Sequence, residues 1–333
     1  MNFSAVGDLS KLFTQRFQNA ALQSELGRLS GELASGETSD LSKQLRGDFS
    51  SVARIGRGLM SASAYETVIS ETRLRADSMQ TALEKVQEAA STSASGSLAA
   101  SITGQVDGLE ASSAEAARQL DDVLLTLNTK VADQALFSGV ATDQAPLADA
   151  NTLFAALDPL LAGASDAGAV QTIVQTWMDD PAGFEATMYQ GSTAVGAHRV
   201  SDSQSITLDV TAIDPAVKDV IEGMILGSLV SRGTLAANVP EQAALTKASA
   251  EALLTADSGF TALRAALGND QARLDQASAA VGAEITGLNV ARNELIGVNP
   301  FETASKLEAT KLQIEMLYTV TARVSRLSLA DYI

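Results

Sequence analysis

A seven-residue apolar repeat near the end of the chain constrains the fold more than any other sequence feature. The repeat consists of Phe260, Leu263, Leu267, Leu274, Val281, Ile285, Leu288 and Leu295. Apolar residues at this period line one side of a helix and favour burial against a second helix. The repeat therefore predicts a long helix in a bundle, whose seam is formed by Leu263, Leu267, Leu274, Val281, Ile285 and Leu288.

The proline distribution allows long helices in the first part of the chain as well. The six prolines all lie at or after Pro146. Because a proline inside a helix costs about 3 kcal/mol or more, a proline-free stretch of this length is what long helices require. Apolar residues recur at helical spacing over 52–62, 79–90 and 116–131, which predicts further helices there.

Each end of the chain carries an amphipathic segment of about the same length. At the start, Leu22, Leu26, Leu29 and Leu33 have the spacing of a coiled-coil seam, and Phe13 and Phe17 lie on an adjoining stripe. At about 1.5 Å per residue, residues 4–33 and 301–331 would each form a rod of roughly 45 Å. One side of the final helix is predicted to carry Leu307, Ile314, Leu317, Val324 and Leu327, with Leu312, Met316 and Val320 widening the stripe.

Two short hinges are predicted to join these end helices to the rest. The first helix is expected to stop at Ser35-Gly36. At the second hinge, Gly297 is expected to take a left-handed C-cap conformation, Asn299 to cap the next helix and Pro300 to occupy its first turn. Glu302 would then complete a capping box.

The end helices need an apolar partner, because burial rather than intrinsic propensity stabilises most helices. Packing against the same chain is the ordinary explanation. However, residues 1–46 hold five basic and five acidic side chains, and residues 301–333 hold four of each. Neutral ends of equal length predict an antiparallel pair that also packs against copies of itself, with Leu22, Leu26, Leu29, Leu33, Leu307, Ile314, Leu317, Val324 and Leu327 as the self-assembly face.

The middle of the chain has a different pattern. Residues 205–211 alternate apolar and polar, as a half-buried strand does, and 197–200 could pair with them. Helices are predicted at 152–161, 169–178 and 215–229. The fold class is thus mainly α: a long antiparallel helical bundle or coiled coil built from both termini, with a small α+β insert. The expected segments are 1–46, 47–140, 141–230, 231–298 and 299–333.

Composition excludes most catalytic chemistry. The chain has no cysteine and one histidine, His198, so thiolate sites, His-rich metal sites and most catalytic triads are excluded. The pairs Asp121-Asp122 and Asp179-Asp180 are expected to be solvated surface, since sequence neighbours on a helix point apart. No enzyme activity, cofactor or metal is therefore predicted.

Net charge and hydropathy argue against nucleic acid and membranes as binding partners. The formal net charge is −17, and residues 121–222 hold three basic and fifteen acidic side chains, which is −12. This charge disfavours binding to nucleic acid or to anionic membranes. The longest apolar run, near residues 223–230, is too short to span a membrane. The first residues lack the pattern of a cleavable secretory signal, so any export is expected to use another route.

Several motifs resemble one family. The stretch from Leu26 to Gly36, LGRLSGELASG, is similar to the N-terminal helix and turn of bacterial flagellins and flagellar hook-associated proteins. Further stretches of this chain resemble motifs of the same family. They are Leu136-Phe137-Ser138-Gly139, Tyr189-Gln190-Gly191 with the 199–210 hairpin and Asp214-Pro215, and the C-terminal stretches 313–318 and 327–333. After Gly36 the family usually continues with a basic pair and a proline-containing turn, whereas this chain has Glu37-Thr38-Ser39-Asp40.

The resemblance implies a structural subunit of the bacterial flagellum, polymerised outside the cell between hook and filament. It implies a homo-oligomeric ring or tube, a neighbouring hook-associated protein and flagellin as partners, and an export chaperone on the C-terminal helix. It also implies delivery through the flagellar type III channel without a cleaved signal. Two alternatives stay open: a filament subunit, and a soluble coiled-coil binding or scaffold module.

Overall fold

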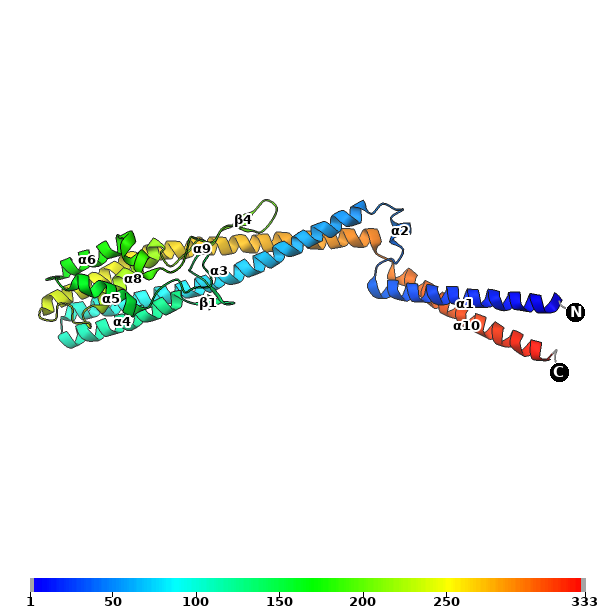
Figure 1. Ribbon diagram of the computed structural model, residues 1–333, viewed down its shortest axis with the longest axis horizontal. Helices are drawn as coiled ribbons and strands as arrows, with labels where there is room; N and C mark the ends of the chain where they lie inside the picture. Colours follow the sequence, from blue (N-terminus) through cyan, green and yellow to red (C-terminus); the bar gives the residue numbers. More distant parts are fainter. Residues whose placement is uncertain (1–2, 331–333) are drawn as a thin grey trace. The chain divides into compact units, whose positions relative to one another are not determined.

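The computed structural model describes the backbone of residues 3–330 and the side chains of residues 13–323. The protein is mainly helical, with two small antiparallel hairpins, which confirms the predicted fold class (Figure 1). The chain forms two compact units: unit 1 consists of residues 1–63 and 282–333, and unit 2 of residues 64–281.

Four long helices provide most of the structure. They are α1 (Phe3–Ser35), α3 (Ser50–Thr103), α9 (Val239–Ile296) and α10 (Pro300–Ala330). The second stretch of apolar residues at helical spacing, over 52–62 and then 79–90, lies within the single helix α3. No helix of the described part is both long enough and apolar enough to cross a membrane.

In unit 2, α3 and α9 lie antiparallel. Their polar rims are joined by Gln271 Nε2, which donates to Asp77 Oδ1 at 2.6 Å, and by Gln87 Nε2, which donates to Asp257 Oδ1 at 2.8 Å. Partner numbers fall along α9 as they rise along α3, which defines the antiparallel direction. The predicted seam residues Leu267, Leu274 and Val281 are buried, as is Phe260, while Leu263, Ile285 and Leu288 are half-buried.

The remaining helices of unit 2 form a compact cluster (Figure 1). α8 packs on both α4 and α6, and ten of its 14 residues are buried. The elements of the cluster are α4 (Val106–Leu127), α5 (Ala150–Leu161), α6 (Ala167–Asp179), the π-helical turn η1 (Pro181–Glu185), α7 (Ala186–Met188) and α8 (Pro215–Ser228). The predicted middle helices are thereby confirmed within two residues at each end.

The two hairpins are short. β1 (Lys130–Val131) pairs with β2 (Gln134–Ala135), and β3 (His198–Arg199) pairs with β4 (Ser205–Ile206). The expected 205–211 strand is paired only at its first two residues. Its alternation is nevertheless real, because Ile206, Leu208 and Val210 are buried while the residues between them are exposed. The alternating pattern therefore reflects burial of one side of this segment rather than strand pairing.

Two motifs named in the sequence analysis, 136–139 and 189–191, lie together in unit 2. The Ser192 N–H donates to the Ser138 carbonyl at 2.9 Å, and the Val140 N–H donates to the Thr193 carbonyl at 2.9 Å. Gly139 has φ 65° and lies so close to the Thr193 carbonyl that a Cβ would be 2.1 Å from it. At Gly191 a Cβ would be 2.7 Å from the Ser138 carbonyl. Both glycines are therefore required by close backbone approach.

Glycine at position 223 lets α8 approach α9 closely. A Cβ on Gly223 would lie 2.7 Å from the Leu253 side chain and 3.2 Å from its backbone nitrogen. We predict that Gly223→Ala destabilises the protein by about 1–3 kcal/mol, because overpacking outweighs the gain of about 1 kcal/mol in helix propensity. Chemical denaturation measures this change.

Gly259→Ala in α9 is the matched control, because its Cβ would meet only Ala216 at an ordinary 3.8 Å. That variant should be neutral or stabilised. Equal destabilisation of the two variants would contradict the close-approach explanation.

Two half-buried carboxyls, Glu222 on α8 and Asp214 at its N-cap, make the stability of unit 2 pH-dependent. Burial, together with Asp219 and Asp179, raises the pKa of Glu222 above its ordinary value of 4.5. Burial also raises the pKa of Asp214. The folded state thus binds these protons more tightly than the unfolded chain, so stability falls as pH rises from about 4.5 through the folded pKa.

We predict that Glu222→Gln is more stable than the parent at pH 7 and loses less stability between pH 5 and pH 7. Thermal unfolding across that range measures the effect. Glu88→Gln removes an exposed carboxyl of α3 and controls for the change in net charge. A Glu222→Gln profile parallel to that of the parent would contradict the assignment.

Candidate self-assembly surface

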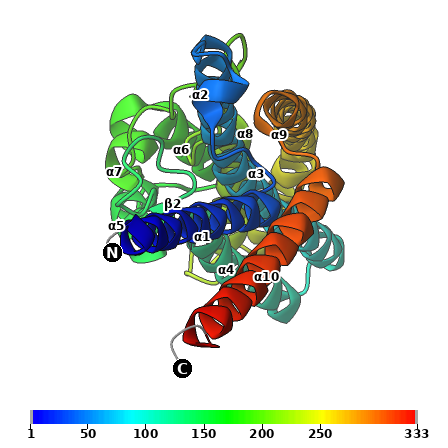
Figure 2. The ribbon, with the colours of Figure 1, turned by 90° about the vertical axis from the view of Figure 1, so that its right-hand side faces the viewer.

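In unit 1, α1 and α10 leave the hinge side by side and form an antiparallel pair (Figures 1 and 2). The predicted residues line the seam of this pair: Leu29 is 2% exposed, and Leu22, Leu26, Leu307, Ile314 and Leu317 are half-buried. Leu33 is 38% exposed. The side chains of Val324 and Leu327 lie outside the described residues. Contacts of this set with other copies stay a prediction.

The seam also contains polar residues that the apolar pattern did not identify. Thr303 and Thr310 are buried on α10, and Glu32 is 4% exposed on α1. On α10, the positions 303, 307, 310, 314, 317 and 321 step by four and three, so the heptad register continues through the threonines. Counting threonine as a seam residue would have revealed this register. The Thr310 hydroxyl donates to the Lys306 carbonyl at 2.8 Å, which satisfies it within its own helix.

Backbone hydrogen bonds join the two hinges to each other. The Thr38 N–H donates to the Ile296 carbonyl at 2.8 Å, and the Val298 N–H donates to the Gly36 carbonyl at 2.9 Å. Glu37 and Gly297 form an isolated antiparallel bridge. The Arg292 guanidinium pairs with the Glu37 carboxylate at 2.7 Å across the same bridge. The hinges predicted from separate ends of the chain are thus one hydrogen-bonded junction.

The roles of two hinge residues differ from the expectation. The left-handed glycine is Gly36, with φ 72°, while Gly297 does not have a positive φ. Gly297 is instead required by space, because a Cβ there would lie 2.3 Å from the Asn293 carbonyl. Asn299 caps α10 as predicted, with its Oδ1 accepting from the Phe301 N–H at 3.0 Å.

Glu302 does not close the expected capping box. Its carboxylate pairs with Lys306 at 2.7 Å rather than with the Asn299 amide. The ammonium of Lys306 one turn along offers a charge-assisted bond, which is stronger than a bond to a neutral N–H. Correspondingly, the pKa of Glu302 is lowered by its hydrogen bond with Lys306.

A buried carboxylate fixes the last turn of α1 to the hinge. Glu32 accepts hydrogen bonds from Arg28 Nη1 at 2.7 Å and from the Ser39 N–H at 2.9 Å. Arg28 also pairs with Glu25, and this hydrogen bond lowers the pKa of Glu25. Glu37, Thr38 and Ser39, which follow Gly36, therefore each make a hydrogen bond or ion pair at the hinge.

An apolar stripe on the other side of α10 has no partner within the described residues. Leu312 is 54% exposed, Met316 59% and Val320 51%, and they follow one another at intervals of four. We call these three residues the outer stripe. On α1, Phe13 and Phe17 are 75% and 71% exposed. Single exposed apolar residues are ordinary on protein surfaces, but a row of them along one helix face marks an interaction site.

Charge separates between the two units. Unit 1 holds 12 basic and 12 acidic side chains, and unit 2 holds 11 basic and 28 acidic ones, which sum to the 23 and 40 of the whole chain. The whole net charge of −17 thus belongs to unit 2. Copies of the neutral unit 1 can approach one another without net repulsion.

The family comparison covers the region that contains the outer stripe. Residues 250–333 match the family model of the bacterial flagellin C-terminal helical region. This C-terminal part of the chain is therefore similar to the C-terminal helical region of flagellins. The comparison with curated proteins finds no match.

Two solved structures are similar to this chain. The structure of a protein described as a flagellar hook-associated protein from Vibrio parahaemolyticus has a TM-score of 0.52 and 14% identity, and the match covers 73% of this chain and 95% of that one. The crystal structure of Bacillus cereus FlgL has a TM-score of 0.43 and 13% identity, covering 70% of this chain and 100% of that one. The first of these matches shows a common fold.

The hinge of unit 1 offers a test. We predict that Glu32→Ala accelerates amide exchange at Thr38 and Ser39 and lowers the free energy of opening there by about 1–3 kcal/mol. The reason is that the Ser39 N–H and the Arg28 guanidinium lose a buried acceptor. Hydrogen exchange followed residue by residue measures it.

Glu308→Ala removes an exposed carboxyl of α10 and is the matched control. Unchanged exchange in Glu32→Ala would show that Glu32 does not hold the hinge.

Proposed function

We propose that this flagellin-like protein is a structural axial subunit of the bacterial flagellum that polymerises through α1 and α10 and joins the hook to the filament. The observation that carries the proposal is the outer stripe, which lies inside the flagellin C-terminal region at residues 250–333. The paired end helices and the neutral charge of unit 1 support the same proposal.

The outer stripe gives a physical reason for assembly. Fully burying a large apolar side chain contributes about 1.5–3 kcal/mol, so burying the exposed halves of Leu312, Met316 and Val320 contributes roughly 2–4 kcal/mol per contact. Association also has an entropic cost of several kcal/mol. One such contact is therefore weak, and a ring or tube in which each copy has several neighbours is favoured over a dimer.

The position in the flagellum defines the other partners. As a junction subunit, the protein would contact a hook-associated protein on one side and flagellin on the other. Before assembly, the outer stripe would be covered by an export chaperone, and the subunit would leave the cell through the flagellar type III channel. The acidic surface of unit 2 would face water, where its net charge of −17 keeps it hydrated.

The outer stripe can be tested directly. We predict that the triple variant Leu312→Gln, Met316→Gln and Val320→Gln keeps its helicity as a monomer but does not polymerise. Glutamine is a good helix former and removes only the apolar contact. Sedimentation at concentrations where the parent polymerises measures the outcome.

The double variant Leu125→Gln and Leu254→Gln removes two exposed apolar side chains from unit 2, which are 68% and 57% exposed in the parent, and should polymerise normally. Polymerisation of the triple variant at the parent concentration would remove the outer stripe from the proposal.

The junction role is tested by locating the protein. Immunogold electron microscopy of purified flagella should label a narrow band at the hook boundary, and cells without the gene should release flagellin into the medium. Label along the whole filament would instead identify a filament subunit. Retention in the cytoplasm, with none in sheared flagella, would indicate a soluble coiled-coil scaffold.

A further inference from the structure

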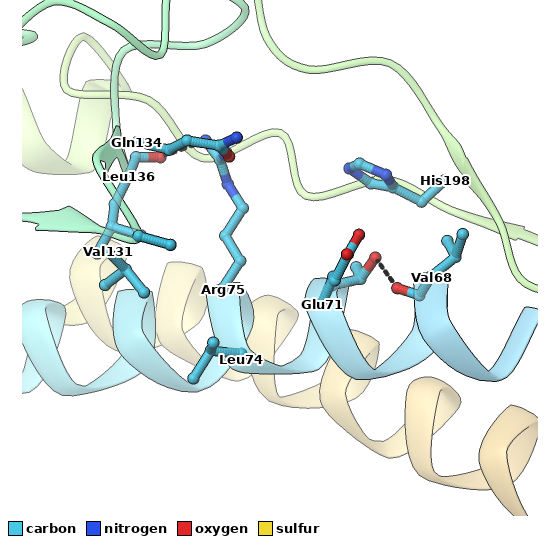
Figure 3. Close-up of a pocket in the computed structure, with 10 residues that line it drawn as sticks. Val68, Glu71, Leu74, Arg75, Val131, Gln134, Leu136 and His198 are labelled. Carbon is cyan, nitrogen blue, oxygen red and sulfur yellow. Dashed lines mark hydrogen bonds between the residues drawn. The ribbon is translucent and has the colours of Figure 1, made fainter.

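Unit 2 contains a pocket that the assembly function does not use. It has a volume of about 320 Å³ and lies between α3, the β1–β2 hairpin and β3 (Figure 3). Its walls include the apolar side chains of Val68, Leu74, Val131 and Leu136. Two cationic or potentially cationic side chains, Arg75 and His198, also line it. This size is at the lower end of small-molecule sites.

Arg75 lies in this pocket without a counter-ion. Its Nη2 donates to the Leu136 carbonyl at 2.8 Å and to the Ala135 carbonyl at 3.3 Å, which fixes the guanidinium on the hairpin. Among the described residues, no carboxylate lies within 4.0 Å of it, whereas Arg73 on the same helix pairs with Asp275 at 2.9 Å. Burial lowers the pKa of Arg75, which is the effect of lost hydration without a compensating anion.

Two nitrogen atoms of the pocket are buried without a hydrogen-bond partner. They are Arg75 Nε and His198 Nε2. Figure 3 shows the two side chains facing each other across an open space above α3, with Glu71 below them. Burial and the neighbouring Arg75 lower the pKa of His198, and Glu71 acts in the opposite direction. Since buried polar groups are normally paired, these two nitrogens are available as hydrogen-bond partners for a ligand.

We propose that this pocket binds a small organic monocarboxylate, whose carboxylate accepts hydrogen bonds from Arg75 and His198 and whose apolar part lies against Val68, Leu74 and Val131. A carboxylate supplies the missing negative charge and the missing acceptors together. Glu71 disfavours a second negative charge, which selects against inorganic phosphate. The apolar walls select for a ligand with an apolar body. Small shifts of Arg75 and His198 would expose the two nitrogens to it.

Binding would connect three segments that are distant in sequence. Arg75 belongs to α3, the carbonyls that hold it belong to the β1–β2 hairpin, and His198 opens β3. A ligand held by both side chains therefore stabilises the attachment of both hairpins to α3. By mass action, it also raises the unfolding temperature as its concentration rises.

His198 provides a single-residue reporter, because it is the only histidine in the chain. Benzoate is the probe, and the full-length protein is titrated while the imidazole signals are followed by NMR. We expect a saturable shift with benzoate and none with benzamide, its neutral analogue. Arg75→Gln should weaken benzoate binding at least tenfold, while the matched variant Arg73→Gln on the same helix should bind like the parent.

Three results would overturn the proposal. They are a non-saturable benzoate shift, benzoate binding by Arg75→Gln equal to that of the parent, and binding of inorganic phosphate as tight as that of benzoate. If Arg75→Gln does not fold, His198→Phe replaces it, because this variant keeps a ring and removes the donor. Benzoate should then raise the unfolding temperature of the parent but not that of His198→Phe, and an equal rise in both would reject the site.

Discussion

The backbone junction at the hinges is the interaction on which unit 1 depends. Two N–H groups, from Thr38 and Val298, bind carbonyls on the other hinge, more than 250 residues away in sequence. These bonds, with the Arg292–Glu37 pair and the buried Glu32, set where α1 ends and where α10 begins. Because the two helices leave the junction together, their apolar seams meet in a fixed register. Without the junction, each would be a lone amphipathic helix of marginal stability.

A pair of helices can bury only one side of each, and this limit explains the two kinds of apolar surface on α10. The seam uses leucine, isoleucine and threonine at alternating steps of four and three. The outer stripe lies on a different face, so it cannot be buried by α1 at the same time. Threonine in the seam keeps the pair narrow while its hydroxyl is satisfied within the helix. The surplus apolar face is therefore a property of the helix pair itself.

Much of the fold followed from the sequence because it rests on local patterns. Long proline-free stretches, the heptad register through Leu267, Leu274 and Val281, and the Asn299 cap are all readable from neighbours within seven residues. The errors at the hinges concern the choice between competing local arrangements. The sequence pattern does not show that Gly36 takes the positive φ, whereas Gly297 is required by the close Asn293 carbonyl, or that Glu302 pairs with Lys306.

The same distinction explains what was missed in the candidate sites. The apolar pattern could not separate seam residues from the outer stripe, since both are helical apolar positions and only the partner helix decides which becomes buried. The sequence showed the segments around Gly139 and Gly191 only as two separate motifs, because their contact depends on close backbone approach between segments 52 residues apart (191 − 139). The sequence analysis used His198 only to exclude catalytic sites, because no local pattern shows that Arg75, more than 120 residues earlier, lines the same pocket.

The division of charge gives the two units different physical behaviour in an assembly. Unit 1 is neutral and carries the exposed apolar stripe, whereas unit 2 holds all 17 net negative charges. When copies gather through unit 1, their acidic units are brought closer together and repel one another. This repulsion is screened over about 8 Å at physiological salt, while the apolar contact is not screened at all. In the proposed polymer, subunit spacing would thus be set by a short-range attraction in one unit and a salt-dependent repulsion in the other, which would favour regular packing over unlimited aggregation.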